Sequence, residues 1–411
     1  MYQKSSWLKI GRPKTFTKLR ISHAAARSLA PGGEVDASPP PRSSRRGAAL
    51  IVGALVLLAA FVATAPYLSS VLKQGYSVFS GLTPASLGTQ TSTVGPVGNI
   101  TTTSVQCSSA VSVKSLVAPD ITNGSANVAY PADYCALAAF ALTQINADRA
   151  ANGTGPVSLD YNEAAQQHAD SMLYYEYFSH FDTQGYKPYM RYSLLGGRAA
   201  DYENVAYYSS VFKSTSSVED AIKTLENLMV YNDSVCCNNG HRNNILDPLR
   251  NRVSIGVAYS NTHVYFDEEF ENNYLNLNFS VTGSSASDPY YVTMTGAPTQ
   301  AVPAPSSVYV AFDSTPTPET KTQLNNSPHE YGPGTLVGGI LPRDSFLETC
   351  ARFTAGTTVC ADTWRFTSTS VDIAFSLEDF VKNYGPGVYT VYLVTGASTD
   401  SALTTISVFV S

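Results

Sequence analysis

Charged side chains are scarce in this 411-residue chain: Asp, Glu, Lys and Arg make up only 14% of it, and the net charge is −6. Binding to nucleic acid requires clustered Lys and Arg that neutralise backbone phosphates. Basic residues are concentrated only in the first 46 positions, which carry ten Lys and Arg against two acids. The remainder of the chain is acidic, so we expect no nucleic-acid partner.

Several motifs that identify common active sites are also missing. There is no H-E-x-x-H, which would supply two zinc-binding histidines and a general base, and no G-x-S-x-G nucleophile turn. The six cysteines form no C-x-x-C pair, which disfavours a zinc knuckle or a thioredoxin-like site. No internal repeat of fixed period is visible, so a solenoid or propeller is not expected.

One uncharged apolar run follows Arg45-Arg46 and extends from Gly47 to Leu68. At about 1.5 Å per residue, a helix of this length spans a hydrocarbon core of roughly 30 Å. No polar face appears at helical spacing, as a buried core helix would require. Ala63-Thr64-Ala65 resembles a signal-peptide cleavage site, but the preceding basic region is too long for one. We predict an uncleaved membrane helix at 47–68, with residues 1–46 cytoplasmic and the rest outside.

Cysteine usage agrees with an extracellular location, because all six residues follow the apolar run. Cys350 and Cys360 are the easiest pair to assign. Adjacent Cys236 and Cys237 are not expected to bond to each other, so each is predicted to reach Cys107 or Cys135. Six N-x-S/T triplets also follow the run, which is compatible with a glycoprotein.

Composition divides the exported part into segments. Residues 69–130 are rich in Ser, Thr, Val and Gly and read as an extracellular stalk. Residues 131–282 contain helical periodicity followed by strand-like runs. Residues 283–302 resemble a linker, and 303–411 contain short β-rich runs separated by Gly, Pro, Ser and Asp. That texture suits one β-sandwich of the immunoglobulin-like kind.

Within 131–282 the apolar spacing predicts three helices, over about 133–151, 162–177 and 217–231. Strands are predicted at 252–260 and 262–270, and a third is suggested at 276–282. Helices first and a short antiparallel sheet afterwards indicate an α+β fold.

Three polar residues in this segment stand beside predicted turns: His180, Glu203 and His241. Two neutral imidazoles and a carboxylate suit Zn²⁺ or a similar divalent ion, and three protein ligands leave one position open to water. The three are more than twenty residues apart, and each has an ordinary structural reading, such as a hydrogen-bonded core histidine or a capping carboxylate. From spacing alone, a shared site is the minority interpretation.

Motifs in order along about 150 residues resemble the CAP superfamily, the cysteine-rich secretory, antigen 5 and pathogenesis-related-1 group, closest to its bacterial-type form. In the printed numbering they are Asn146–Arg149 (N-x-x-R), Phe178–His180 (FSH), Glu203–Ala206 (GENIA-like, with Tyr202 where Gly is usual), Gly240–Leu246 (G-H-R-x-N-I-L) and Ile255–Val257. The resemblance implies an α-β-α sandwich, and it covers neither the stalk nor the C-terminal region.

The family's cavity residues carry over in part. The histidine pair corresponds to His180 and His241, and the first glutamate to Glu203. Tyr231 occupies the position of the second glutamate, with Glu226 as an alternative that needs a shift in register. The resemblance therefore implies a cavity containing His180, Glu203, His241 and Tyr231, with the first three as metal ligands. His168 lies on an apolar helical stripe and is interpreted as structural.

Two functions are consistent with these features. The first is a non-catalytic binding module at the cell surface, tethered through 47–68, for a metal, a lipid or glycan, or an envelope polymer. The alternative is a metal-assisted hydrolase of peptide or cell-wall polymer, with Glu203 as general base. We favour the binding module, because no second carboxylate is aligned to complete a catalytic site.

Overall fold

The structure is a computed structural model that describes residues 19–23 (backbone only), 118–122, 124–283, 288–327, 330–344, 349–353 and 356–411. The predicted membrane helix at 47–68 lies outside these residues, as do most of the predicted tail and stalk. In the part of the chain that is described, no helix is both long enough and apolar enough to span a bilayer.

The helices of the first domain confirm the three that periodicity predicted and add short ones. They are α2 (Tyr134–Ala151), α3 (Glu163–Tyr175), α4 (Pro188–Leu194), α5 (Thr215–Tyr231), the 3₁₀ turn η2 (Asp233–Val235) and α6 (Gly240–Ile245). Asn162 caps α3 by accepting a hydrogen bond from the amide of Ala164, as a residue of its type does at a helix start. The sequence analysis did not predict α4 and α6, because six or seven residues are too few to show a period.

A mixed sheet forms the centre of this domain. Its strand order is β1 (Leu19–His23), β5 (Ala200–Ser209), β7 (His263–Asn272), β6 (Arg252–Tyr259) and β4 (Ser158–Asp160). The predicted strands at 252–260 and 262–270 are confirmed as β6 and β7. Glu203, which was predicted to lie in a loop, is instead in the middle of β5. β5 is largely buried on both faces, so its sequence shows no alternation of polar and apolar residues, and the strand was not predicted.

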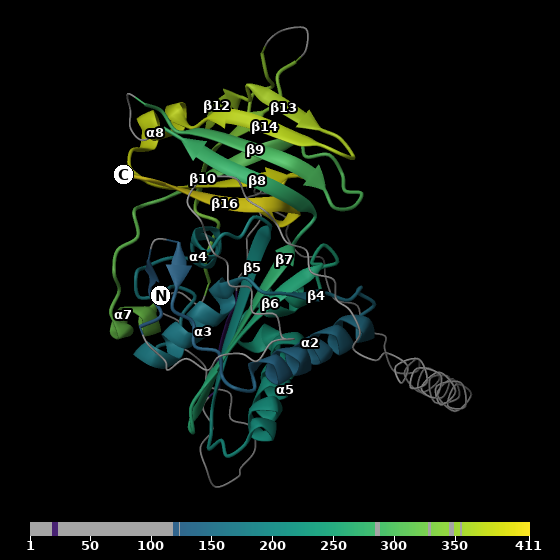
Figure 1. Cartoon of the computed structure of the whole chain (residues 1–411), viewed down its shortest axis with the longest axis vertical. Helices are drawn as coiled ribbons and strands as arrows, with labels where there is room; N and C mark the ends of the chain where they lie inside the picture. The colour runs from purple at the N-terminus through teal and green to yellow at the C-terminus, as the bar shows by residue number, and fades with distance from the viewer. Residues whose placement is uncertain are drawn as a thin grey trace, which may run out of the picture. The chain divides into compact units, whose positions relative to one another are not determined.

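Helices cover both faces of the sheet, so the α+β expectation is confirmed, and the layers are those of an α-β-α sandwich (Figure 1). One face carries Phe266 and Phe270, which pack in one core with α2 and α5. The opposite face carries Val205 and Tyr265, which pack with Met172 of α3. Successive residues of a strand point to opposite faces, so each strand supplies both layers.

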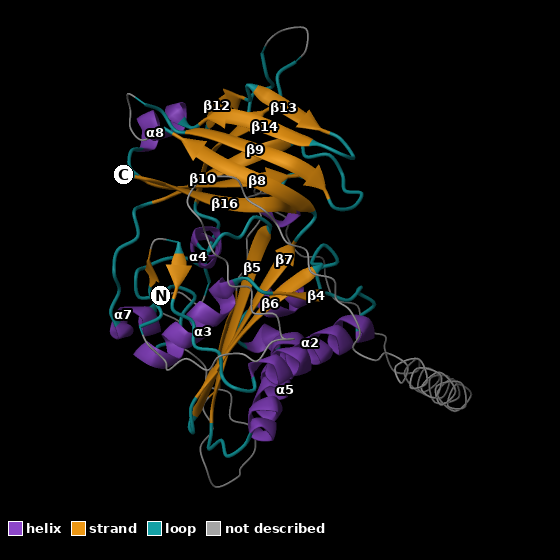
Figure 2. Cartoon of the chain, in the orientation of Figure 1, coloured by secondary structure: helices purple, strands orange, loops and turns teal. Residues whose placement is uncertain are grey.

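The second domain is a β-sandwich, as predicted, although it begins earlier (Figure 2). One sheet has the order β12 (Thr357–Cys360), β11 (Thr335–Leu341), β10 (Ser307–Asp313), β15 (Gly387–Val394) and β16 (Ala402–Val410). The other has the order β13 (Thr363–Phe366), β14 (Val371–Ser376), β9 (Tyr291–Pro298) and β8 (Leu275–Thr282). Apolar residues of both sheets share one core.

Two predicted boundaries between the domains need correction. The strand suggested at 276–282 belongs to β8, which pairs with β9 of the sandwich and not with the first sheet. The predicted linker at 283–302 therefore contains a strand of the second domain. Alternation of apolar residues reveals a strand but not its partner, so the sequence could not assign β8 to a sheet.

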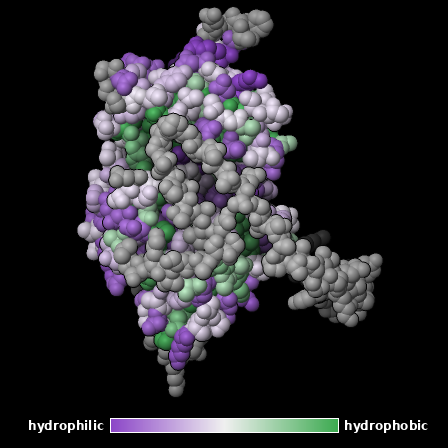
Figure 3. Space-filling model, viewed as in Figure 1, coloured by the Kyte–Doolittle hydropathy of each residue, from purple (hydrophilic) through white to green (hydrophobic). Residues whose placement is uncertain are grey.

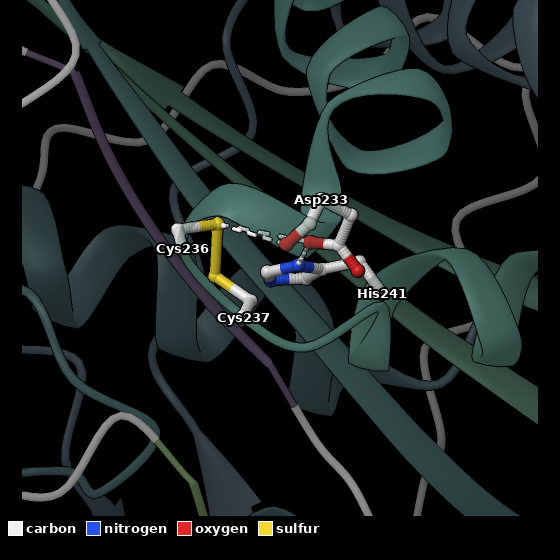
Figure 4. A group of neighbouring side chains, drawn as sticks. All are labelled: Asp233, Cys236, Cys237 and His241. Atoms are coloured by element: carbon white, nitrogen blue, oxygen red, sulfur yellow. Dashed lines mark hydrogen bonds and ion pairs between the residues drawn. A yellow bond between two sulfur atoms is a disulfide. The ribbon is translucent and has the colours of Figure 1, made fainter. Parts of the chain in front are cut away.

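Of the two expectations about disulfide pairing, the structure confirms one and contradicts the other. Cys350 and Cys360 form the expected disulfide. The expectation for Cys236 and Cys237 was wrong, because they are bonded to each other. Neighbouring side chains diverge in an extended strand. Here the backbone of Cys236 is in the helical region, at φ −102° and ψ −38°, and both sulfurs reach the same side of the turn (Figure 4).

Candidate functional site

Glu203 is at the centre of a fully buried polar group on the α3 side of the sheet. One carboxylate oxygen lies 2.7 Å from Nδ1 of His180, and the other accepts a hydrogen bond from Arg191 of α4. Arg191 also donates to the carbonyl of His180 at 2.8 Å, so the three residues brace one another. Burial raises the pKa of Glu203 to about 7, while the positive charge of Arg191 opposes that rise.

Further carboxyl groups surround Glu203. Glu269 of β7 is its direct partner in the antiparallel register, and Asp201 and Asp267 lie on the same face. All four are at most 5% exposed. Glu269 lies within hydrogen-bonding reach of both Glu203 and Asp201, and burial is the main cause that raises its pKa to about 8. A hydrogen bond between two carboxyl groups requires a proton on one of them, so at least one carboxyl group of this cluster is protonated when such a bond forms.

A second carboxyl pair lies on the opposite face of the sheet. Glu226 of α5 contacts Glu268 of β7, and Asn204 donates to Glu268 at 3.1 Å. Burial raises the pKa of both glutamates. Glu226, the alternative for the family's second glutamate, is therefore separated from Glu203 by the sheet itself.

A second buried polar group lies at the turn from η2 into α6. His241 is in α6, and its Nδ1 is 2.5 Å from Oδ1 of Asp233 in η2. The other oxygen of Asp233 accepts from the amide of Arg242 at 3.1 Å. The Cys236–Cys237 disulfide lies beside this pair (Figure 4). Burial lowers the pKa of His241 and favours the neutral imidazole, whereas Asp233 has the smaller, opposite effect on this pKa.

The remaining predicted site residues lie elsewhere. Tyr231 is 52% exposed, and its hydroxyl donates to Asp148 at 2.8 Å on the surface of the helices. His168 is fully buried in α3, with Nε2 2.8 Å from the carbonyl oxygen of Ser179. This bond ties α3 to the loop that carries His180.

The predicted metal ligands are not assembled as one set. Among the described residues, two groups of three or more potential ligands have donor atoms that all lie within 4.8 Å of one another. One contains His168, Glu203 and Asp267, and the other contains Asp233, Cys236, Cys237 and His241. Glu203 and His241 are thus divided between the groups, and both oxygens of Glu203 already contact His180 and Arg191. An ion shared by His180, Glu203 and His241 does not fit this arrangement.

A segment between β10 and β11 covers the His180 side of the site. It contains α7 (Lys321–Asn326), whose Leu324 is fully buried against Met172 and Phe178. The hydroxyl of Tyr331 accepts a hydrogen bond from the amide of Glu203 at 2.8 Å, and its ring lies 4.9 Å from that of His180. The C-terminal part of the chain therefore closes this group off from solvent.

Sequence reasoning missed Arg191, Asp233 and the carboxylates of β7. Arg191 and Asp233 stand alone in their segments and offer no pattern. The run Asp267-Glu268-Glu269 lies in the strand predicted at 262–270, but the sequence does not show that helices bury both faces of that strand. Tyr331 comes from beyond the domain, and no local signal connects it to Glu203.

The fold is an α-β-α domain with two buried histidine–carboxylate pairs: His180, in the loop after α3, contacts Glu203 of β5, and His241, in α6, contacts Asp233 of η2. Residues 142–279 match the model of the cysteine-rich secretory protein family, CAP. The chain therefore contains a domain of the CAP superfamily, as its motifs indicated. No curated protein matches the sequence.

Proposed function

We propose that this chain is a cell-surface binding protein, without catalytic activity, whose first domain, together with the start of β8, holds a neutral or amine-bearing glycan of the cell envelope. The proposal is carried by a polar cleft of about 350 Å³ beside β4 and the start of β8. Its polar lining combines carboxylates, amides, tyrosines and one arginine: Asp160, Tyr161, Asn162, Glu163, Tyr192, Arg198, Glu271, Asn273 and Asn276.

This composition suits a sugar better than a lipid. Carboxylate and amide oxygens accept hydrogen bonds from sugar hydroxyls, and a tyrosine ring offers an apolar face with a polar tip. A lipid site requires a mainly apolar pocket. Hydrophobic residues on the molecular face shown in Figure 3 are interspersed among hydrophilic ones, which is also unlike a lipid-docking surface.

Charge narrows the ligand further. Asp160, Glu163 and Glu271 line the cleft, and Arg198 is its one basic lining residue among those described. The guanidinium of Arg198 is engaged with backbone carbonyls of Ser193 and Gly197. Carboxyl groups outnumber Arg198 in the lining, so an acidic polysaccharide would meet an excess of like charge here, and a neutral or amine-bearing sugar fits best.

Two features disfavour hydrolysis. Glu203, the predicted general base, is fully buried, and both of its oxygens are occupied by His180 and Arg191. In the cleft, Asp160 and Glu271 are in hydrogen-bonding reach of each other. Glycosidase carboxyl pairs stand about 5 Å or more apart to admit the sugar and water between them. This pair is too close for that chemistry.

Titration with soluble oligosaccharides tests the binding proposal. Neutral and amino-sugar oligomers are expected to bind the full chain, and polygalacturonate is not. Tyr161→Ala or Asn276→Ala should weaken binding about tenfold, a loss near 1.4 kcal/mol. Tyr174→Ala is the matched control, because Tyr174 is 44% exposed on α3 and does not line the cleft. Equal losses in all three variants, or no binding by any sugar, would exclude the cleft.

The hydrolase alternative has its own test. The full chain is incubated with peptide and glycan polymers, and product ends are counted. We expect no turnover. Turnover that Glu203→Gln abolishes, in a variant that remains folded, would overturn the non-catalytic reading.

Tethering at the surface is part of the same proposal and rests on the run at 47–68 and its basic flank. A crossing there would put residues before 47 on the other side of the membrane from β5. Pairing of β1 with β5 requires both strands on one side. The crossing at 47–68 and the β1–β5 pairing therefore exclude each other. Protease treatment of intact cells tests the crossing: release of a soluble fragment supports the tether, and full protection contradicts it.

A further inference from the structure

The turn from η2 into α6 gathers four side chains of metal-binding type. Asp233 comes from η2, Cys236 and Cys237 follow it, and His241 is in α6. One donor atom from each lies within 4.8 Å of all the others. Figure 4 shows the four side chains converging on one point beside the helix ends.

Asp233 is the centre of this group. Its Oδ1 lies 2.5 Å from Nδ1 of His241 and 3.8 Å from Sγ of Cys236. A tetrahedral Zn²⁺ with bonds of about 2.0–2.3 Å holds its ligand atoms roughly 3.3–3.8 Å apart. The carboxylate–sulfur spacing already matches that of an assembled site. The carboxylate–imidazole contact is a hydrogen bond, and it must lengthen by roughly 1 Å when an ion takes the place of its proton.

The oxidation state of the sulfurs decides whether an ion can enter. In the disulfide neither sulfur is a thiolate, and thiolate is the form that binds metal. Two-electron reduction by a dithiol converts the disulfide to two thiols and the dithiol to its own disulfide. Metal binding then releases the two thiol protons. Cys236 is solvent-exposed, so a dithiol can reach its sulfur.

We propose that Asp233, Cys236, Cys237 and His241 form a redox-gated site for a thiophilic divalent cation of the Zn²⁺ type. The disulfide form is closed to the ion, and the reduced form binds one ion per chain. Two thiolates, one imidazole and one carboxylate are a donor set that favours tetrahedral zinc over magnesium or calcium. The site is distinct from the predicted set of His180, Glu203 and His241, with which it shares only one histidine.

The simpler reading is that the Cys236–Cys237 bond only staples the turn. Its neighbours argue for more, because a staple does not require a buried carboxylate and imidazole beside the sulfurs. Asp233 and His241 are each at most 1% exposed. Together with the two sulfurs they form a set of four potential metal ligands, which a purely structural disulfide does not need.

The test uses the full chain in both redox states. Protein is reduced with a phosphine, separated from it without oxygen and titrated with Co²⁺. We expect one Co²⁺ per chain with a thiolate-to-metal charge-transfer band in the reduced form, none in the disulfide form, and displacement by Zn²⁺. Re-oxidation of the zinc-loaded protein should release one Zn²⁺ per chain to a colour indicator.

Paired variants assign the signal to this turn. Cys236→Ser with Cys237→Ser should abolish the band, and His241→Ala should weaken binding at least tenfold. Cys350→Ser with Cys360→Ser is the matched control and should keep it. Circular dichroism shows whether each variant is folded. Reduced, folded wild-type protein without the band refutes the site, and so does a band that survives loss of Cys236 and Cys237. Binding in both redox states without a thiolate band also refutes it.

Discussion

The buried carboxyl cluster makes a specific prediction about pH. Glu269 is fully buried, faces Glu203 and Asp201, and has no other hydrogen-bond donor in the part of the chain that the structure describes. Replacing it by glutamine keeps its size and removes its charge. Glu269→Gln should therefore leave the protein unchanged in acid and make it more stable than the wild type at alkaline pH.

The magnitude follows from proton linkage. Burial raises the pKa of Glu269 from its ordinary value of 4.5 to about 8 in the folded protein. Between those values the folded state keeps a proton that the unfolded chain has lost, so stability falls as pH rises. The contribution is intact below pH 4.5 and is lost as pH passes 8. At 1.36 kcal/mol per unit, a shift of this size corresponds to a loss of several kcal/mol, which Glu269 shares with the carboxyl groups that it contacts. A whole domain is stable by about 5–15 kcal/mol, so this one residue matters.

Denaturant unfolding at pH 4.5, 6 and 8, followed by circular dichroism, measures the effect. Wild-type protein should lose stability steadily with pH, and Glu269→Gln should remove a large part of that slope. Asp220→Asn, on the exposed side of α5, is the control and should follow the wild type. A wild type that is as stable at pH 8 as at pH 4.5, or a variant with an unchanged slope, would refute the reasoning.

Three further predictions concern stability. A Cβ on Gly256 would lie 2.1 Å from the carbonyl oxygen of Ala165, so Gly256→Ala should push α3 from β6 and lower the melting temperature by several degrees, as calorimetry would show. Cys350→Ser with Cys360→Ser opens a short loop and should lower the unfolding free energy by about 3 kcal/mol in denaturant titration; no change would show that the disulfide is not formed. Leu324→Ala should cost about 2–5 kcal/mol and speed proteolysis between β10 and β11, and unchanged cleavage would contradict the covering role of α7.

Much of the fold was accessible from local pattern. The helices α2, α3 and α5 carry enough turns for the apolar period to emerge, and β6 and β7 are rich in residues that favour strands. β5 was missed because a strand buried on both faces with Glu203 and Asn204 in its middle shows no alternation of polar and apolar residues. β8 was visible as a strand, but its partner depended on contacts with a segment that had been read as a linker.

The candidate site was predictable only residue by residue. Motif order identified His180, Glu203 and His241 as notable, yet it could not show what each side chain contacts. The alternation of β7 sends Glu268 to one face and Glu269 to the other, and this geometry divides the carboxyl groups into separate clusters. Motif spacing carries no information about that division.

The sequence by itself determined the CAP resemblance, the apolar run at 47–68, the acidic balance and the Cys350–Cys360 pair. These properties are encoded in composition, order and short-range spacing. Only the tertiary structure decided that Glu203 is sealed by Arg191 and Tyr331, and that Cys236 and Cys237 bond beside Asp233 and His241. Burial and the direction of side chains depend on which surfaces pack together, and that is a property of the whole folded chain.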